Sequence, residues 1–468
     1  MMHTPSPKPI SRRGFIAAGT SAALLTTLAA CGGGNTTATV QDTQAAKGLD
    51  IQGDHLTYDP NTLVNNGDPI TIEWWLWDGD EKFKAFADAY SKIHPNVEIK
   101  IVNQAWDDYW TKLPLALQGD DGPALFNIHN SYHENVLPYC EAYDMDLDSL
   151  SQDFVGVDGH VIDDSVYYID YGLMTGLIFY NKAMWETAGL TDEDIPTTWD
   201  EFREIAKKLT VRDGNSFQQA GFDFNDSLYL MLLGKHYQSG YNLFDASGTS
   251  VQVDNEVMKS DFQYFKDLYD VDQVGSPDFG PNAQEAFGQG LSAMHYSWGH
   301  LYGTMANDYP EIEFGTFQFP VNNADETPYA YDRYNGESTP GINKNASDGA
   351  REVAQDFLKF FLTSNDLLVD LCLNYSLFPS SVALADNTEI KQHPVTSALG
   401  SIDRYVWPGP MPATVEDNMK IAVSDVLYNG VGIPEALTTA KAAIDADIAK
   451  TDFSSVEGLY AHADELVG

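Results

Sequence analysis

Aromatic side chains stand beside acids and amides at several places in this sequence. Trp75 and Trp77 alternate along an apolar run that ends at Asp78, and Trp106 opens a later polar segment. An indole ring can stack on a flat apolar face, while carboxylate, amide and hydroxyl groups orient polar edges through hydrogen bonds. These residue types together suit a ligand that offers both kinds of surface, such as a sugar.

Strands and helices alternate in the part of the chain that carries these residues. The runs 69–77, 97–102 and 124–129 are typical of buried strands, and apolar residues recur at helical spacing over 82–93 and 107–117. This order predicts an α/β fold with a parallel sheet covered on both faces, where ligands bind at the carboxyl ends of the strands. The alternation also points Trp74 toward the core.

Helices continue through the second half of the sequence. Thr198 and Glu201 form a capping box that predicts a helix through Leu209. We interpret Trp110, Trp185 and Trp199 as packing residues, because they lie at helical positions or at a helix start. Further helices are expected over residues 228–236, 256–269, 283–291, 350–362, 365–373, 415–428 and 433–451.

The charge of the chain restricts its partners. There are 69 Asp and Glu residues against 26 Lys and Arg, which gives a formal net charge of −43. Such a charge repels nucleic acid and anionic membrane surfaces and favours neutral or cationic ligands. The length of 468 residues, 43% of them hydrophobic, allows two or three folded domains.

The N-terminal residues predict export and lipidation. Arg12 and Arg13 precede an apolar stretch that is too short to span a bilayer and that ends at Ala30-Cys31. The arginine pair resembles a twin-arginine export signal, and Leu28-Ala29-Ala30-Cys31 resembles a lipobox, which leaves Cys31 acylated at the new N-terminus. We therefore expect residues 1–30 to be an export signal and residues 31–67 a flexible tether on the outer face of the cell membrane.

Two cysteines follow Cys31. Cys140 and Cys372 could form one disulfide outside the cell, or they could remain two buried thiols, because each has apolar neighbours. The sequence leaves both alternatives open.

A family resemblance is carried by segments spread over most of the chain from Pro69 on. These segments are Asp108-Tyr109 to Gly119, Gly122-Pro123-Ala124, Gly176 to Lys182, Ala188-Gly189-Leu190, Pro196 to Phe202, Ala286 to Met294, Phe357 to Phe361, Pro379 and Gly430 to Ala443. In their order and spacing they resemble family 1 of the extracellular solute-binding proteins, the lipid-anchored receptors of ABC importers for sugars, whose fold is like that of maltodextrin-binding protein.

The resemblance implies a type II periplasmic-binding-protein fold with two α/β lobes, each a mostly parallel sheet flanked by helices. Matching segments place three hinge crossings near residues 170–175, near 334–337 and just after Pro379. Lobe one is then 68–172 plus 336–380, and lobe two is 173–335 plus 381–468. The implied function is capture of a neutral mono- or oligosaccharide by a monomer that delivers it to the importer's membrane subunits, without enzymatic activity, cofactor or metal.

The expected ligand-binding residues combine positions after strands with positions that the resemblance supplies. Trp298 follows a strand after which this family commonly places a stacking aromatic. Trp407 lies in a proline-rich loop, and Tyr171 falls at an expected crossing. The full set is Trp75, Trp77, Asp78, Trp106, Asn130, Ser131, Tyr132, Tyr171, Asn225, Trp298, Asn335, Gly336, Glu337 and Trp407.

Three other functions remain as alternatives. A secreted carbohydrate-active hydrolase needs a pair of carboxylates, which 69 acids do not exclude, but neither a Gly-x-Ser-x-Gly elbow nor a phosphate-binding loop is present. The second alternative is a metal receptor. His129 and His133 have the spacing of zinc ligands, but the segment lacks the Glu of the His-Glu-x-x-His motif. A receptor for a peptide or a cationic solute is compatible with the acidic composition.

Overall fold

The computed structural model describes residues 53–77, 80–119, 121–224, 228–400 and 402–467. The expected export signal, Cys31 and most of the expected tether lie outside the described residues, as do two expected site residues, Asp78 and Asn225. Within the described part, none of the helices is long and apolar enough to cross a membrane.

The first sheet has the strand order β2-β1-β3-β11-β4. β1 pairs in parallel with β2 and β3, as the alternation of strands and helices predicts, whereas β11 joins β3 and β4 antiparallel. Trp74 is fully buried and its indole N–H donates to Asn127, which confirms that it faces the core. The strands are β1 (Ile70–Leu76), β2 (Val97–Asn103), β3 (Leu125–Phe126), β4 (Cys140–Glu141) and β11 (Gly341–Asn343).

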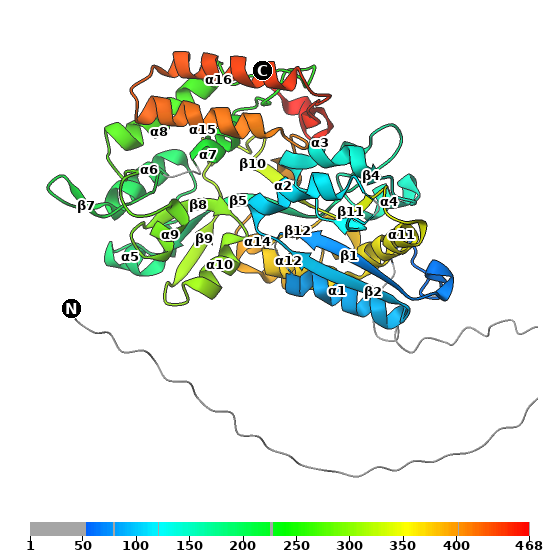
Figure 1. Cartoon of the computed structure of the whole chain (residues 1–468). Coiled ribbons are helices and arrows are strands. Elements are labelled where there is room, and N and C mark those ends of the chain that lie inside the picture. Colours follow the sequence, from blue (N-terminus) through cyan, green and yellow to red (C-terminus); the bar gives the residue numbers. More distant parts are fainter. Residues whose placement is uncertain (1–52, 78–79, 120, 225–227, 401, 468) are drawn as a thin grey trace, which may run out of the picture. The chain divides into compact units, whose positions relative to one another are not determined.

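The second sheet is built on one long strand, β5, which ends near the centre of Figure 1. The amino-terminal half of β5 pairs with β10 and β12, and its carboxyl-terminal half pairs with β8 and β9. β13 extends the sheet beside β10. The strands are β5 (Asp170–Asn181), β8 (Met294–Trp298), β9 (Phe314–Phe317), β10 (Asp332–Ser338), β12 (Phe378–Pro379) and β13 (Tyr405–Val406), and a separate hairpin joins β6 (Val211–Asp213) to β7 (Ser216–Gln219).

The strand directions of the second sheet differ from the mostly parallel arrangement expected from the sequence. All four neighbours of β5 run antiparallel to it, and only β10 and β13 pair in parallel. Every residue of β5 is buried, so its sequence lacks the alternation that would mark a face. Its direction is set by connections between segments far apart in the chain, which local patterns do not reveal.

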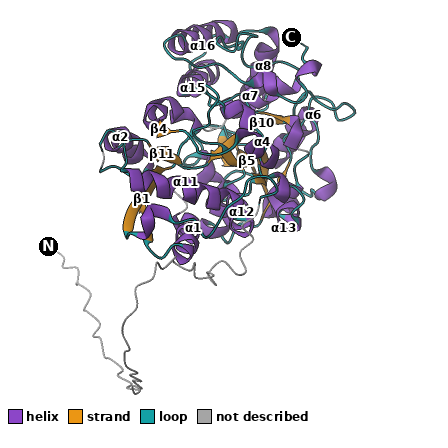
Figure 2. Cartoon of the chain, turned by 90° about the vertical axis from the view of Figure 1, so that its right-hand side faces the viewer, coloured by secondary structure: helices purple, strands orange, loops and turns teal. Residues whose placement is uncertain are grey.

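Helices cover both sheets. α1, α11 and α12 lie beside β1, and α15 and α16 lie side by side (Figures 1 and 2). The Thr198 capping box is present, with Glu201 bonded back to the start of α6. The helices are α1 (Asp80–Ile93), α2 (Trp106–Ala116), α3 (His133–Val136), α4 (Leu147–Asp153), α5 (Lys182–Thr187), α6 (Trp199–Leu209), α7 (Leu228–Gln238), α8 (Glu256–Asp270), α9 (Ala283–Gly288), α10 (Leu301–Asp308), α11 (Asp348–Thr363), α12 (Asn365–Tyr375), α13 (Thr388–Gln392), α14 (Pro394–Ser397), α15 (Ala413–Leu427) and α16 (Ile433–Ile448).

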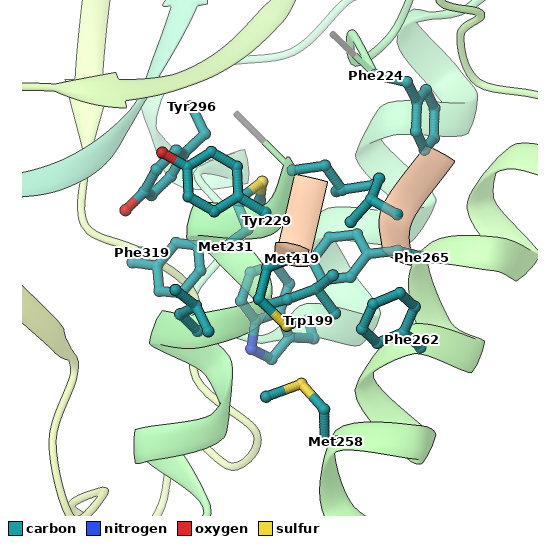
Figure 3. Close-up of a cluster of buried hydrophobic side chains, with 14 of the residues drawn as sticks. Trp199, Phe224, Tyr229, Met231, Met258, Phe262, Phe265, Tyr296, Phe319 and Met419 are labelled. Atoms are coloured by element: carbon teal, nitrogen blue, oxygen red, sulfur yellow. The ribbon is translucent and has the colours of Figure 1, made fainter. Parts of the chain in front are cut away.

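Two large apolar cores hold these layers. One joins β1 to α1, α11 and α12, and the other joins the carboxyl-terminal half of β5 to α6, α7, α8, α15 and α16. In the second core Trp199 lies among Met258, Phe262 and Phe265, three residues of α8 (Figure 3). Trp185 and Trp199 are both buried in this core, in agreement with their interpretation as packing residues.

The packed part of the chain begins before residue 68, the start expected from the sequence. Leu56, Tyr58 and Val64 are buried against the first core. The Leu56 backbone N–H donates to Asp153 at 2.6 Å, and the His55 N–H donates to the same carboxylate. These apolar anchors are single residues among Gly, Thr, Asn and Asp, so they give no periodic signal in the sequence.

The two cysteines that follow Cys31 are unpaired. Cys140 and Cys372 are buried and free, and the Cys140 thiol donates to the Val136 carbonyl at 3.4 Å. Burial raises the pKa of each thiol to about 12. Of the two alternatives that the sequence leaves open, the structure has the two buried thiols.

Candidate functional site

A cavity of about 280 Å³ collects side chains from the ends of both sheets. Its first wall follows β2 and β3 of the first sheet, and its second wall comes from β8 and β10 of the second sheet together with α7, α15 and the loop after β13. Six expected site residues meet here, namely Trp106, Asn130, Ser131, Trp298, Asn335 and Trp407. The other lining residues are His129, Tyr229, Leu230, Arg333, Tyr334, Pro408, Gly409, Met411 and Glu416.

Trp106 is the exposed aromatic residue of the first wall. It is the first residue of α2, and 38% of its surface is exposed. Trp110 and Tyr132, stacked with ring centroids 4.2 Å apart, contact Trp106 edge-on, and Trp77 adds a third edge contact. Such edge contacts favour one orientation of the indole. Trp106 therefore offers a fixed apolar face to a ligand.

Asn130 ties the first wall to β10. Its side-chain amide nitrogen donates to Asn335 Oδ1 at 3.0 Å and to the Gly336 carbonyl at 3.2 Å. Its own Oδ1 is buried without a partner among the described residues. Gly336 itself lies close to β5, since a Cβ on it would fall 1.6 Å from the Asp170 carboxylate.

Trp298 and Arg333 stand together in the second wall. The Arg333 guanidinium lies 5.2 Å from the centre of the Trp298 ring, a cation–π contact. Arg333 is buried, and its Nη1 donates to the Leu230 carbonyl at 3.0 Å and to Asp332 at 3.3 Å. Its Nη2 has no partner among the described residues. Asp332 balances the charge of Arg333 inside the wall, although burial raises the pKa of Asp332 to about 6.

The remaining wall groups add little charge. Burial lowers the pKa of His129 to about 4, against the opposing influence of Glu416, so its imidazole is neutral at pH 7. Burial and the nearby Glu416 raise the pKa of Tyr229, which stays a neutral phenol. Glu416 is the only carboxylate among the described lining residues.

Trp407 is buried in the wall, with 7% of its surface exposed. It lies parallel to Tyr334, with ring centroids 6.3 Å apart, and packs against His160 at 4.5 Å. Gly159 also lies close, since a Cβ there would fall 2.4 Å from the indole ring. These neighbours leave Trp407 less free than Trp106 to stack on a ligand.

None of the other expected residues that the structure describes lines this cavity. Trp75 is half-buried and bonds Glu73, and Tyr132 stacks on Trp110. Tyr171 is buried against Phe83 and Phe361 in the first core. A separate space of about 40 Å³ is lined by Trp77, Tyr171 and Glu337, among others.

Several lining residues carry no signal in the sequence. Arg333, Tyr229 and Glu416 lie in a strand and two helices that carry no motif, and only the long-range arrangement of these elements brings them to one place. His129 also has the spacing of a zinc ligand with His133. No group of three or more His, Cys, Asp or Glu residues able to hold a metal exists in the described part of the chain.

A family model described as bacterial extracellular solute-binding protein matches residues 76–365, more than half of the chain. The chain belongs to this family. Membership makes it a solute-binding protein and not an enzyme.

Individual relatives are more distant. The arabinooligosaccharide-binding protein of Bacillus subtilis (strain 168) is 28% identical over 124 residues, which are 26% of this chain and 27% of that protein. The maltotriose-binding protein of Pyrococcus abyssi (strain GE5 / Orsay) is 23% identical over 357 residues, 74% of each chain.

Solved structures share the fold. The cyclic alpha-maltosyl-1,6-maltose binding protein from Arthrobacter globiformis has a TM-score of 0.68 at 21% identity, over 82% of this chain and 100% of that chain. The maltose/maltodextrin-binding domain of MalE from Bdellovibrio bacteriovorus, bound to maltotriose, has a TM-score of 0.63 at 18% identity, over 81% and 100%. These matches confirm the predicted α/β fold of periplasmic binding proteins.

Proposed function

We propose that this chain is an extracytoplasmic receptor, anchored by a lipid on Cys31, that captures a neutral oligosaccharide between two lobes and passes it as a monomer to the membrane subunits of an ABC importer. The observation that carries the proposal is the cavity with Trp106 on one wall and Trp298 beside Arg333 on the other. A flat ring can stack on the indoles while its hydroxyl groups bond the amide, guanidinium and carboxylate groups.

Neutral ligands fit the charges of the cavity. Arg333 is matched by Asp332, and His129 is neutral at pH 7. The net charge of −43 disfavours the approach of an anion. Relatives named for binding arabinooligosaccharide and maltotriose support an oligosaccharide as the ligand.

Closure of two lobes supports capture. We assign residues 68–172 plus 336–380 to lobe one and residues 173–335 plus 381–468 to lobe two. In support, the three expected crossings pair within one sheet, with Gly172 of β5 opposite both Glu337 of β10 and Pro379 of β12. A ligand that contacts both lobes binds the closed form better and shifts the population toward it.

Small-angle scattering tests this closure. The radius of gyration is expected to decrease when a saturating sugar is added. A radius that stays constant while calorimetry records binding would contradict closure and would place the ligand on one lobe.

A ligand screen tests the choice of ligand. We expect titration calorimetry to detect maltotriose or an arabinose oligosaccharide, and chromatography to recover the sugar intact. A cationic peptide and a polyamine serve as competitors. Binding of either one with no sugar response would replace the proposal by a cationic-solute receptor, and sugar cleavage would indicate a hydrolase.

Trp298→Ala tests the site. Loss of a stacked anchor typically costs about 2 kcal/mol, so the affinity is expected to fall about 30-fold. Trp185→Ala is the matched control, because Trp185 is buried away from the cavity and its loss should lower Tm without changing the affinity of the folded protein. The reverse pattern would contradict this placement of the site.

Cys31→Ser tests the anchor. The variant lacks the thiol that the lipid would modify, so it should appear as a soluble protein or an uncleaved precursor. If it fractionates with membranes as completely as the parent protein, the lipid anchor is wrong.

A further inference from the structure

A second and larger cavity shares two lining residues with the cavity of Trp106 and Trp298, which we call the ligand cavity. Its volume is about 480 Å³, and Tyr334 and Trp407 line both cavities. On its other sides are Phe154, Tyr405 and Tyr460. It is thus formed by the segment before β5, the start of β10 and the residues that precede and follow the last two long helices.

The lining of this second cavity is aromatic and acidic. Phe154, Tyr334, Tyr405, Trp407 and Tyr460 supply five aromatic rings. Two lining residues, Asp158 and Asp403, are acids, and none of the described lining residues is Lys, Arg or His. Arg404, which follows the lining residue Asp403, is bound to both carboxylate oxygens of Glu465 at 2.6 and 2.9 Å.

This lining differs from that of the ligand cavity in the chemistry that it can bind. The ligand cavity has a buried arginine and two asparagines that can bond hydroxyl groups. The second cavity is lined by aromatic rings, apolar side chains such as Val157 and Leu173, and acids. Aromatic faces attract cations, and quaternary ammonium groups are recognised by aromatic cages because they combine charge with an apolar surface.

We infer that the second cavity is a binding site for a small cation with an apolar surface, of the quaternary ammonium class. The net charge of −43 raises the local concentration of such a cation around the protein. Asp158 is exposed at the cavity, and Asp403, paired with His462 at 3.1 Å, adds negative charge.

Choline is the probe, and 3,3-dimethylbutan-1-ol is its neutral counterpart of the same shape. Titration without sugar should detect choline with a Kd of about 1 mM or tighter, a modest affinity for so small a ligand. The alcohol should bind at least about tenfold more weakly, because it lacks the cation–π and carboxylate attraction. Equal binding of both compounds, or no choline binding, would overturn the inference.

Substitutions that fill the second cavity test whether choline binds there. Val155 and Leu459 line the cavity and are 47% and 61% exposed, so a larger side chain at either position need not disturb the core. Val155→Trp and Leu459→Trp should each abolish choline binding and leave sugar affinity unchanged. Trp298→Ala, which alters only the ligand cavity, should leave choline affinity unchanged.

The opposite result has a definite meaning. Choline affinity that survives both Trp variants but is lost in Trp298→Ala would place choline in the ligand cavity and overturn the inference. Because choline is measured without sugar, failure of this site would leave the proposed sugar site standing.

A charge variant tests the contribution of the acids. Asp158→Asn should weaken choline binding about two- to fivefold, the effect of one partly screened charge. Asp452→Asn is the matched control, since Asp452 is exposed and does not line the cavity. Equal effects of the two substitutions would mean that only the overall charge matters and would contradict a local role for Asp158.

Discussion

The tryptophans of the ligand cavity differ from those of the core in where their indole N–H groups bond. Trp185 and Trp199 are 2% and 3% exposed, and their N–H groups donate to Thr191 O and Gln238 Oε1 at 2.9 and 2.8 Å. Trp106 and Trp298 are more accessible, and no described residue accepts from their N–H groups. A core indole N–H is satisfied within the protein, whereas the N–H of a cavity tryptophan is left available for a ligand in the proposed site.

The largest effect is expected from Trp199→Ala. Trp199 fills the space between α6 and α8 and contacts Phe202, Tyr264, Phe265 and Phe319 (Figure 3). Removing such a ring costs about 3–5 kcal/mol of the free energy of unfolding. Denaturant unfolding measures the loss, and calorimetry on the folded fraction should show unchanged sugar affinity. Weaker sugar binding by a stably folded Trp199→Ala protein would break the distinction between the two groups.

The second-largest effect is expected at Glu457, a buried acid beside the core that contains Trp199. Glu457 accepts from the backbone N–H groups of Leu243 and Phe244 at 2.9 and 3.0 Å and from the Tyr237 hydroxyl. Burial nevertheless raises its pKa from 4.5 to about 7. The folded protein thus binds this proton more tightly than the unfolded chain does, so the stabilising effect is complete below about pH 4.5 and is lost as pH rises through 7.

Glu457→Gln isolates this dependence. Between pH 4.5 and 7.5 the parent should lose about 3 kcal/mol of unfolding free energy relative to the variant, since one pKa unit corresponds to about 1.4 kcal/mol. Denaturant curves at several pH values measure the difference. Glu435→Gln, at an exposed position on α16, should leave the pH dependence of the parent unchanged. Parallel pH profiles for the parent and Glu457→Gln would contradict the raised pKa.

A smaller effect, on affinity and not on stability, is expected from Trp106→Ala. Loss of the exposed stacking face should weaken sugar binding by about 2 kcal/mol, or about 30-fold. Tm should change little, because Trp106 is 38% exposed. Trp298→Ala should lower both affinity and Tm, since it also removes the ring beside Arg333. A large Tm loss in Trp106→Ala would show that Trp106 belongs with the core residues.

Sequence patterns predict the local part of this molecule well. Helical spacing and the Thr198 capping box place α6 and α8 to within a residue or two. Trp106 and Asn130, expected to follow β2 and β3, line the cavity. The positions of the other cavity residues depend on pairing between strands that are far apart in the sequence. Arg333 reaches Trp298 because β5 lies between β8 and β10, and no local pattern near Arg333 indicates this.

Burial explains why Tyr171, an expected site residue, does not line the ligand cavity. Tyr171 lies at an expected crossing, as the family resemblance implies, but its ring packs into the first core. Nothing in a sequence distinguishes a tyrosine that faces a cavity from one that faces a core when every residue of its strand is buried. The face of β5 that each residue occupies is decided by the elements on either side.

The smallest effect is expected from Asn130→Ala. The substitution removes two neutral hydrogen bonds, to Asn335 Oδ1 and to the Gly336 carbonyl, which connect the segment after β3 to β10. We expect a loss of about 1–2 kcal/mol in unfolding free energy, because a typical hydrogen bond contributes about 1 kcal/mol. Sugar affinity should fall as well, since Asn130 lines the cavity and its Oδ1 lacks a partner among the described residues. Ser397→Ala, which removes one exposed hydrogen bond to Pro394, is the control and should change neither quantity. If Asn130→Ala lowers stability but leaves sugar affinity unchanged, Asn130 connects the two sheets without contacting the ligand, and the polar contacts of the ligand must come from the second wall.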